Sequence, residues 1–145
     1  MKKRIDIQQL EPEAFKAMFT LENYLQNSGL SKTHFYLIKI RASQINGCAF
    51  CINMHTTEAI KHGETAQRIF LLNAWKETNV FNDEEKTILA ITEEVTLISQ
   101  HGLTDDTYNQ AEKLFNENQI AKIIMAVVTI NAWNRIVIST KKTVE

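Results

Sequence analysis

The chain has 145 residues, which favours one domain, because roughly 100–200 residues per domain is usual. Apolar residues make up 44% and charged residues 23%, an ordinary globular composition that excludes a disordered chain. Lys and Arg number 16 against 17 Asp and Glu, so the net charge of −1 gives no sign of a nucleic-acid or anionic-membrane partner. Two cysteines are too few for a disulfide scaffold. We therefore expect a single domain over residues 1–145.

The N-terminus does not resemble an export signal. Three basic residues, Lys2 to Arg4, are followed by a segment that is too polar for the apolar part of such a signal. The longest strictly apolar run, residues 123–128, is much shorter than a membrane span. We expect a cytoplasmic protein with no nucleic-acid or membrane partner, in which thiols stay reduced unless chemistry oxidises them.

Capping residues and glycines divide the chain into helical segments, within which apolar residues recur three or four apart. The predicted helices span about 12–27, 31–43, 48–61, 64–78, 82–102, 104–114 and 116–136. The helix over 82–102 is expected to bury Ile88, Ile91, Val95 and Ile98. Strands do not alternate with helices, which disfavours a parallel sheet. The sequence predicts an all-α bundle of about six or seven helices.

Two tripeptides repeat late in two apolar helices, Asn73-Ala74-Trp75 and Asn131-Ala132-Trp133. Similar packing of two amphipathic helices explains the repeat, and a shared role in an oligomer or pocket is the alternative.

Both cysteines lie in one short motif that follows Gly47 and ends at His55. On a helix, Cys48, Cys51 and His55 fall within an arc of roughly 60°. Gly47 lets the chain turn sharply, and the first amides of the following helix would stabilise a thiolate. The helix dipole favours Cys48 as the thiolate, whereas the reach of His55 favours Cys51. The pattern suits a redox dithiol and leaves the choice of nucleophile open.

Other interpretations of the motif are weaker. Covalent haem attachment is excluded because Ile52 stands where that motif needs histidine. A structural zinc site needs four ligands, and the cluster supplies three, with His34, His62 and His101 scattered elsewhere. A thioredoxin-like site would follow a strand, whereas both flanks here are helical. Two inert buried cysteines remain an alternative. No cofactor or metal is expected.

The stretch Ile38–His55 closely resembles the AhpD-like alkylhydroperoxidase branch of the carboxymuconolactone decarboxylase family. The segments Leu72–Thr78 and Ile130–Arg135 are also similar to that family, although they are weaker markers. The resemblance implies an all-α fold, a trimeric or hexameric homo-oligomer, and thiol-dependent reduction of small hydroperoxides.

Carried over by position, Cys51 resembles the cysteine that attacks the peroxide, and Cys48 the cysteine that resolves the sulfenic acid as a disulfide. His55 matches the relay histidine. Tyr36 departs from the pattern, because better-known members have a relay glutamate at this position, and a phenol is a poor base at neutral pH. Its hydroxyl could still orient a water or hold a hydrogen bond, and a buried aromatic with no role in the reaction explains it equally well. Ser43 lies in the matching stretch and could orient groups at the site, although packing explains it better.

The sequence therefore predicts a thiol-dependent peroxidase whose thiol or protein reductant is unknown. A decarboxylase-type lyase acting on a small lactone acid is an alternative, although such chemistry does not need a dithiol. A non-enzymatic helical oligomer that senses oxidants through a reversible disulfide is another.

Overall fold

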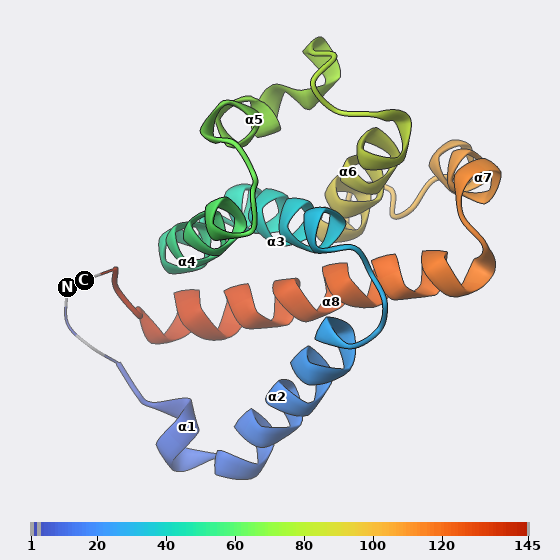
Figure 1. Ribbon diagram of the computed structural model, residues 1–145. Coiled ribbons are helices and arrows are strands. Elements are labelled where there is room, and N and C mark those ends of the chain that lie inside the picture. Colours follow the sequence, from blue (N-terminus) through green and yellow to red (C-terminus); the bar gives the residue numbers. More distant parts are fainter. Residues whose placement is uncertain (1, 3, 145) are drawn as a thin grey trace.

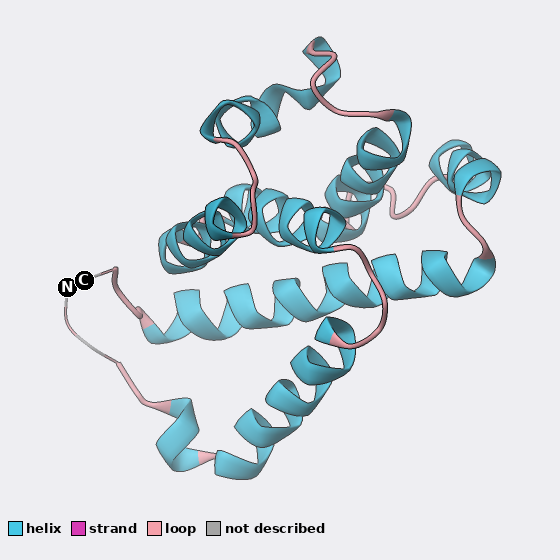
Figure 2. Cartoon of the chain, in the orientation of Figure 1, coloured by secondary structure: helices cyan, strands magenta, loops and turns pink. Residues whose placement is uncertain are grey.

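The computed structural model describes residues 2 and 4–144, and over these residues the chain forms eight α-helices, one 3-10 helix and no strand (Figure 2). The helices are α1 (Ile7–Leu10), α2 (Pro12–Gln26), α3 (Lys32–Asn46), α4 (Ala49–Lys61), α5 (Ala66–Leu71), α6 (Asp83–Thr96), α7 (Asp105–Leu114) and α8 (Glu117–Thr140), with the 3-10 helix η1 (Leu72–Glu77) after α5. The predicted all-α fold is confirmed.

Helix α3 lies at the centre of the bundle and packs against α4, α6 and α8 (Figure 1). Residues 35–40 of α3 are all buried, as expected for a helix that is covered on every side. The long α8 lies between α2 and the layer that contains α3 and α6. The most deeply buried isoleucines come from these central helices: Ile38, Ile40, Ile88, Ile91, Ile123 and Ile130. The core therefore surrounds α3, the helix that leads into the cysteine motif.

In the first half of the chain the structure differs from the predicted helices at two places. The short helix α1 was not predicted; Asp6 caps it by accepting a hydrogen bond from the Gln9 amide at 3.3 Å. The helix predicted over 64–78 is split: α5 ends at Leu71 and η1 follows, within which Ala74 leaves helical geometry. The tighter turn brings Trp75 to α6, where its indole Nε1 donates to Glu93 Oε1 at 2.7 Å.

The predicted helix over 82–102 also ends early. Helix α6 stops at Thr96, and Ile98 lies in the following turn with 59% of its surface exposed, so its predicted burial was wrong. The reason is the carboxylate of Glu94, which accepts hydrogen bonds from the amide of Thr104 at 2.8 Å and from the hydroxyl of Thr107 at 2.7 Å. These bonds hold the start of α7 against the end of α6 and reverse the chain.

Helix α8 is the one helix of the described residues that is long and apolar enough to cross a membrane by length and composition. In this fold it contributes buried residues to the core and packs against α2, α3 and α6.

Candidate active site

The turn between α3 and α4 places both cysteines at the start of a helix. Gly47 ends α3 with a φ of +69°, a left-handed conformation that glycine adopts without strain. The Cys48 amide then donates to the Ser43 carbonyl at 3.0 Å. Helix α4 begins one residue later than predicted, with Cys48 as its N-cap, whose Sγ accepts from the Cys51 amide at 3.4 Å. The positive end of the helix therefore faces the Cys48 sulfur.

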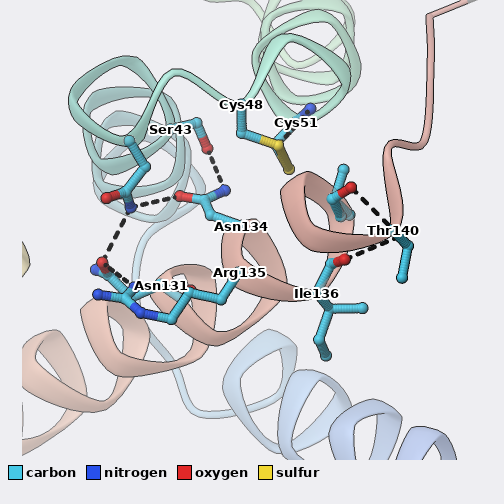
Figure 3. The surroundings of a disulfide bond; sticks show 10 residues. Ser43, Cys48, Cys51, Asn131, Asn134, Arg135, Ile136 and Thr140 are labelled. Carbon is cyan, nitrogen blue, oxygen red and sulfur yellow. Dashed lines mark hydrogen bonds between the residues drawn. A yellow bond between two sulfur atoms is a disulfide. The ribbon is translucent and has the colours of Figure 1, made fainter. Parts of the chain in front are cut away.

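Cys48 and Cys51 form a disulfide, with their Cα atoms 5.3 Å apart. The two residues are only 1% and 2% exposed. Figure 3 shows the disulfide beside the last turns of α8, which carry Ile136 and Thr140. The two cysteines are thus in the oxidised state, and their sulfurs are shielded from solvent between α4 and the end of α8.

His55 lies one helical turn after Cys51 and is 4% exposed. Burial lowers its pKa to about 3, and the positive charge of Lys39 contributes in the same direction. The imidazole is therefore neutral at physiological pH. Its Nδ1 lies 3.4 Å from Glu58 Oε2, and with a neutral ring this contact is a hydrogen bond rather than an ion pair. With so low a pKa the ring is a weak base that can accept a hydrogen bond but does not hold a second proton at neutral pH.

A buried ion pair lies close to this histidine. The ammonium of Lys39, on α3, pairs with the carboxylate of Glu22, on α2, and stands 4.3 Å from the ring centre of Phe35. Glu22 also accepts from Trp133 Nε1 at 3.2 Å. Burial lowers the pKa of Lys39, and the Glu22 carboxylate opposes that shift. The positive charge of Lys39 is also the second cause of the low pKa of His55.

Tyr36 is buried, with its hydroxyl 3.4 Å from Nδ1 of His62. The same His62 nitrogen lies 3.0 Å from the Glu58 carbonyl oxygen, so Tyr36 is held against the last turns of α4. Burial raises the pKa of Tyr36, and the negative charge of Glu58 raises it further. The phenol therefore stays protonated at neutral pH and does not act as a base.

Ser43 lies near the end of α3, where its buried hydroxyl contacts α8. Its Oγ accepts from Asn134 Nδ2 at 3.0 Å, and Asn46 Nδ2 donates to the side-chain oxygens of Asn134 at 2.9 Å and Asn131 at 3.0 Å (Figure 3). These amides, from the second Asn-Ala-Trp segment and the residue after it, tie α8 to the end of α3. They hold the backbone that leads into Cys48.

Replacing Asn134 by alanine is expected to destabilise the protein by about 1–3 kcal/mol, because the buried Ser43 hydroxyl and one bond of Asn46 lose their partner. Chemical denaturation of the oxidised protein measures the loss. The matched control is Asn109→Ala, an exposed asparagine on α7, which should change stability by less than about 0.5 kcal/mol. Equal effects of the two substitutions would contradict the anchoring role.

Sequence reasoning did not identify Glu58, Lys39 or the asparagines of α8 as parts of the site. Glu58 had a signal, because it lies three residues after His55 and so on the same helical face. The sequence also contained a signal for the asparagines, because they are polar residues within the most apolar helix. Over the described residues, His, Cys, Asp and Glu form no group that could hold a metal ion.

The sequence profile of the carboxymuconolactone decarboxylase family matches residues 12–94 of the chain. The uncharacterized protein YdfG of Bacillus subtilis (strain 168) is 42% identical over 139 residues, which cover 96% of this chain and 95% of that protein. The alkyl hydroperoxide reductase AhpD of Hyphomonas neptunium (strain ATCC 15444) is 40% identical over 47 residues, or 32% of this chain and 26% of that protein.

Solved structures show the same fold. A protein of unknown function from Agrobacterium tumefaciens, for which an AhpD antioxidant defence role has been suggested, superimposes with a TM-score of 0.95 at 42% identity, covering 99% of this chain and 100% of that one. An uncharacterized peroxidase-related protein from Silicibacter sp. TM1040 superimposes with a TM-score of 0.79 at 20% identity, covering 92% of this chain and 71% of that one, and shares the fold alone.

The chain therefore belongs to the carboxymuconolactone decarboxylase family. Within that family it is an AhpD-like member, with a Cys-x-x-Cys pair at the start of α4.

Proposed function

We propose that this protein is a thiol-dependent peroxidase that reduces small organic hydroperoxides through Cys51 and Cys48. The observation that carries the proposal is the disulfide between these residues at the start of α4, one turn from a buried neutral histidine. The AhpD-like fold supports it, and so does the local similarity to an alkyl hydroperoxide reductase.

The reaction begins with the reduced dithiol. The Cys51 thiolate attacks the terminal oxygen of the hydroperoxide, an S–O bond forms as the O–O bond breaks, and the departing alkoxide takes a proton to become an alcohol. Cys51 is then a sulfenic acid. The Cys48 thiolate attacks that sulfur, water leaves, and the disulfide forms. An external dithiol must return two electrons and two protons to complete the cycle.

Each residue at the site supplies a part of this chemistry. His55 lies one turn after Cys51 and its neutral ring can accept a hydrogen bond there, whereas a pKa of about 3 makes it too weak a base to keep the thiol proton, which passes to solvent or to the departing alkoxide. The Cys51 amide and the N-terminus of α4 stabilise negative charge on Cys48 when it resolves the sulfenic acid.

The burial of both sulfurs favours a second candidate, an oxidant sensor. A shielded disulfide exchanges slowly with external thiols because access limits exchange. Such a protein would form the disulfide once and turn over slowly or not at all. The lyase alternative has no comparable support, because it makes no use of the dithiol.

The test is to treat the reduced protein with one equivalent of an organic hydroperoxide and measure its free thiols and intact mass. Loss of both thiols with a mass decrease of about 2 Da is expected, since two hydrogens leave as the disulfide forms. Sustained consumption with dithiothreitol as reductant is then expected of a peroxidase. Disulfide formation without sustained consumption would favour the sensor, and unchanged thiols would contradict both.

A further inference from the structure

The end of α8 lies beside the disulfide and shields it. Cys48 and Cys51 are buried, and the last turns of α8, which carry Ile136 and Thr140, lie next to their sulfurs (Figure 3). A thiol that reduces the pair must bring its own sulfur up to one of these sulfurs, and a hydroperoxide must reach Cys51 in the same way. Either reactant therefore needs the cover over the sulfurs to move.

This end of α8 is also the least buried part of the helix. Most side chains of residues 126–134 are buried, whereas every side chain of residues 135–140 is half-buried or exposed. Segments with few buried contacts open locally at a smaller free-energy cost than the core does. The last turns of α8 can therefore separate from α4 while the rest of the helix stays packed.

Three features hold the end of α8 in its closed position. Lys141 ends the helix in a left-handed conformation, with a φ of +54°. The ammonium of Lys142 stands 4.3 Å from the ring centre of Phe50, which lies in the first turn of α4 between the two cysteines. From the N-terminal segment, Arg4 Nη1 donates to the Ser139 carbonyl at 2.9 Å. Exposed contacts of these kinds are individually weak, so the closed position is easily lost.

We propose that residues 135–142 form a lid that must open before a thiol or a hydroperoxide reaches Cys48 and Cys51. Lys142 holds this lid against the first turn of α4 through its contact with Phe50. The inference deepens the proposed function and rests on it for the role of the lid in turnover. Opening of the lid also governs reduction of the disulfide, which is measurable without any hydroperoxide.

The test is reduction of the oxidised protein by dithiothreitol, followed by the appearance of protein thiols. One thiolate of the reagent attacks a cysteine sulfur, and the S–S bond breaks as a mixed disulfide forms. The second thiol of the reagent then closes its own cyclic disulfide, so that two electrons and two protons pass to the cysteines. At low reagent concentration, the rate is proportional to the fraction of molecules in which the lid is open.

Two substitutions at the lid should change this rate in opposite directions. Lys142→Ala removes the contact with Phe50 and should speed reduction about two- to fivefold, as expected for the loss of an exposed cation–π contact. Lys141→Gly should slow reduction by a similar factor, because glycine adopts the left-handed end of the helix without strain. Both substitutions remove one positive charge, so an effect of charge on the attacking thiolate would change both rates in the same direction.

The matched control is Lys113→Ala, at an exposed lysine on α7, which should leave the reduction rate unchanged. Urea below the unfolding transition separates opening of the lid from unfolding of the whole protein. Reduction through the lid should rise only slightly with urea, because local opening exposes little surface. A rate that rises as steeply as the unfolding equilibrium constant would overturn the lid.

Reduction rates that are equal in Lys142→Ala and Lys141→Gly, or that change in the same direction, would also contradict the lid. If the two rates change in opposite directions but the wild-type protein consumes no hydroperoxide, the lid stands and the peroxidase assignment fails. If hydroperoxide is consumed with sustained turnover but the reduction rates of the two variants do not differ, the lid fails and the peroxidase assignment stands.

Discussion

Replacing Cys51 by serine is expected to abolish hydroperoxide consumption, with a loss on the order of 10³-fold or more. A serine hydroxyl does not ionise near neutral pH and is a poor nucleophile toward the peroxide bond. Cys48→Ser is expected to behave differently, because Cys51 can still attack. That variant should consume one equivalent, stop, and gain about 16 Da as the sulfenic acid. Mass spectrometry together with a hydroperoxide assay distinguishes the two outcomes.

Comparing the two serine variants also tests which sulfur is the nucleophile. Serine is a good N-cap, so Cys48→Ser should preserve the start of α4. Both variants lack the disulfide, and each is therefore compared with the reduced wild type. If Cys51→Ser retains a single turnover and Cys48→Ser is inert, the helix dipole outweighs the reach of His55 and Cys48 is the nucleophile. Full turnover by either variant would show that the cycle does not require the Cys48–Cys51 disulfide.

The parts of the fold that follow from local patterns were predicted well. Capping boxes at Asn82 and Asn116, each closed by a side chain three residues on, placed the starts of α6 and α8 correctly. Gly47, with its positive φ, ends α3 at Asn46, three residues after the predicted end at position 43. The end of α6 was missed because it depends on Glu94 accepting from Thr104 and Thr107, a contact between two helices that no single helical pattern contains.

The candidate site divides in the same way. Cys48, Cys51 and His55 were found because their spacing on one helix implies proximity. The ion pair of Lys39 and Glu22 could not be found in this way, because it joins α3 to α2 across 17 residues of sequence. Family resemblance identified the missing carboxylate at Tyr36 but not its neighbour Glu58, since position 36 faces α4 only after the helices pack.

Removing the carboxylate partner of Lys39 is expected to cause the largest loss of stability of any single polar substitution proposed for this protein. Glu22→Gln leaves an ammonium that is 2% exposed without its counter-charge, and such losses cost about 3–5 kcal/mol. Lys39→Met should cost less, because it removes the more deeply buried charge and leaves Glu22 bonded to Trp133. Chemical denaturation of the oxidised protein at neutral pH measures both.

The double variant decides whether the two charges act as a pair. Once Lys39 is methionine, Glu22→Gln should add little further cost, so the cycle shows a coupling of about 2 kcal/mol or more. Costs that simply add would mean that each side chain acts through its own packing and that the ion pair contributes nothing.

Lys39→Met should also change how stability depends on pH through His55. The folded-state pKa of His55 is about 3, below its ordinary value of 6.5, owing first to burial and then to Lys39. The unfolded chain therefore binds a proton as pH falls below 6.5 while the folded protein does not, so His55 lowers stability by up to about 1.4 kcal/mol per pH unit down to about pH 3. Removing the Lys39 charge raises the folded-state pKa of His55. The pH range over which His55 lowers stability then ends at a higher pH than about 3. The free energy of unfolding, measured against pH, should fall less on acidification in Lys39→Met than in the wild type. NMR titration of the His55 ring measures its pKa directly in both proteins. An unchanged pKa of His55 would mean that burial alone keeps the ring neutral.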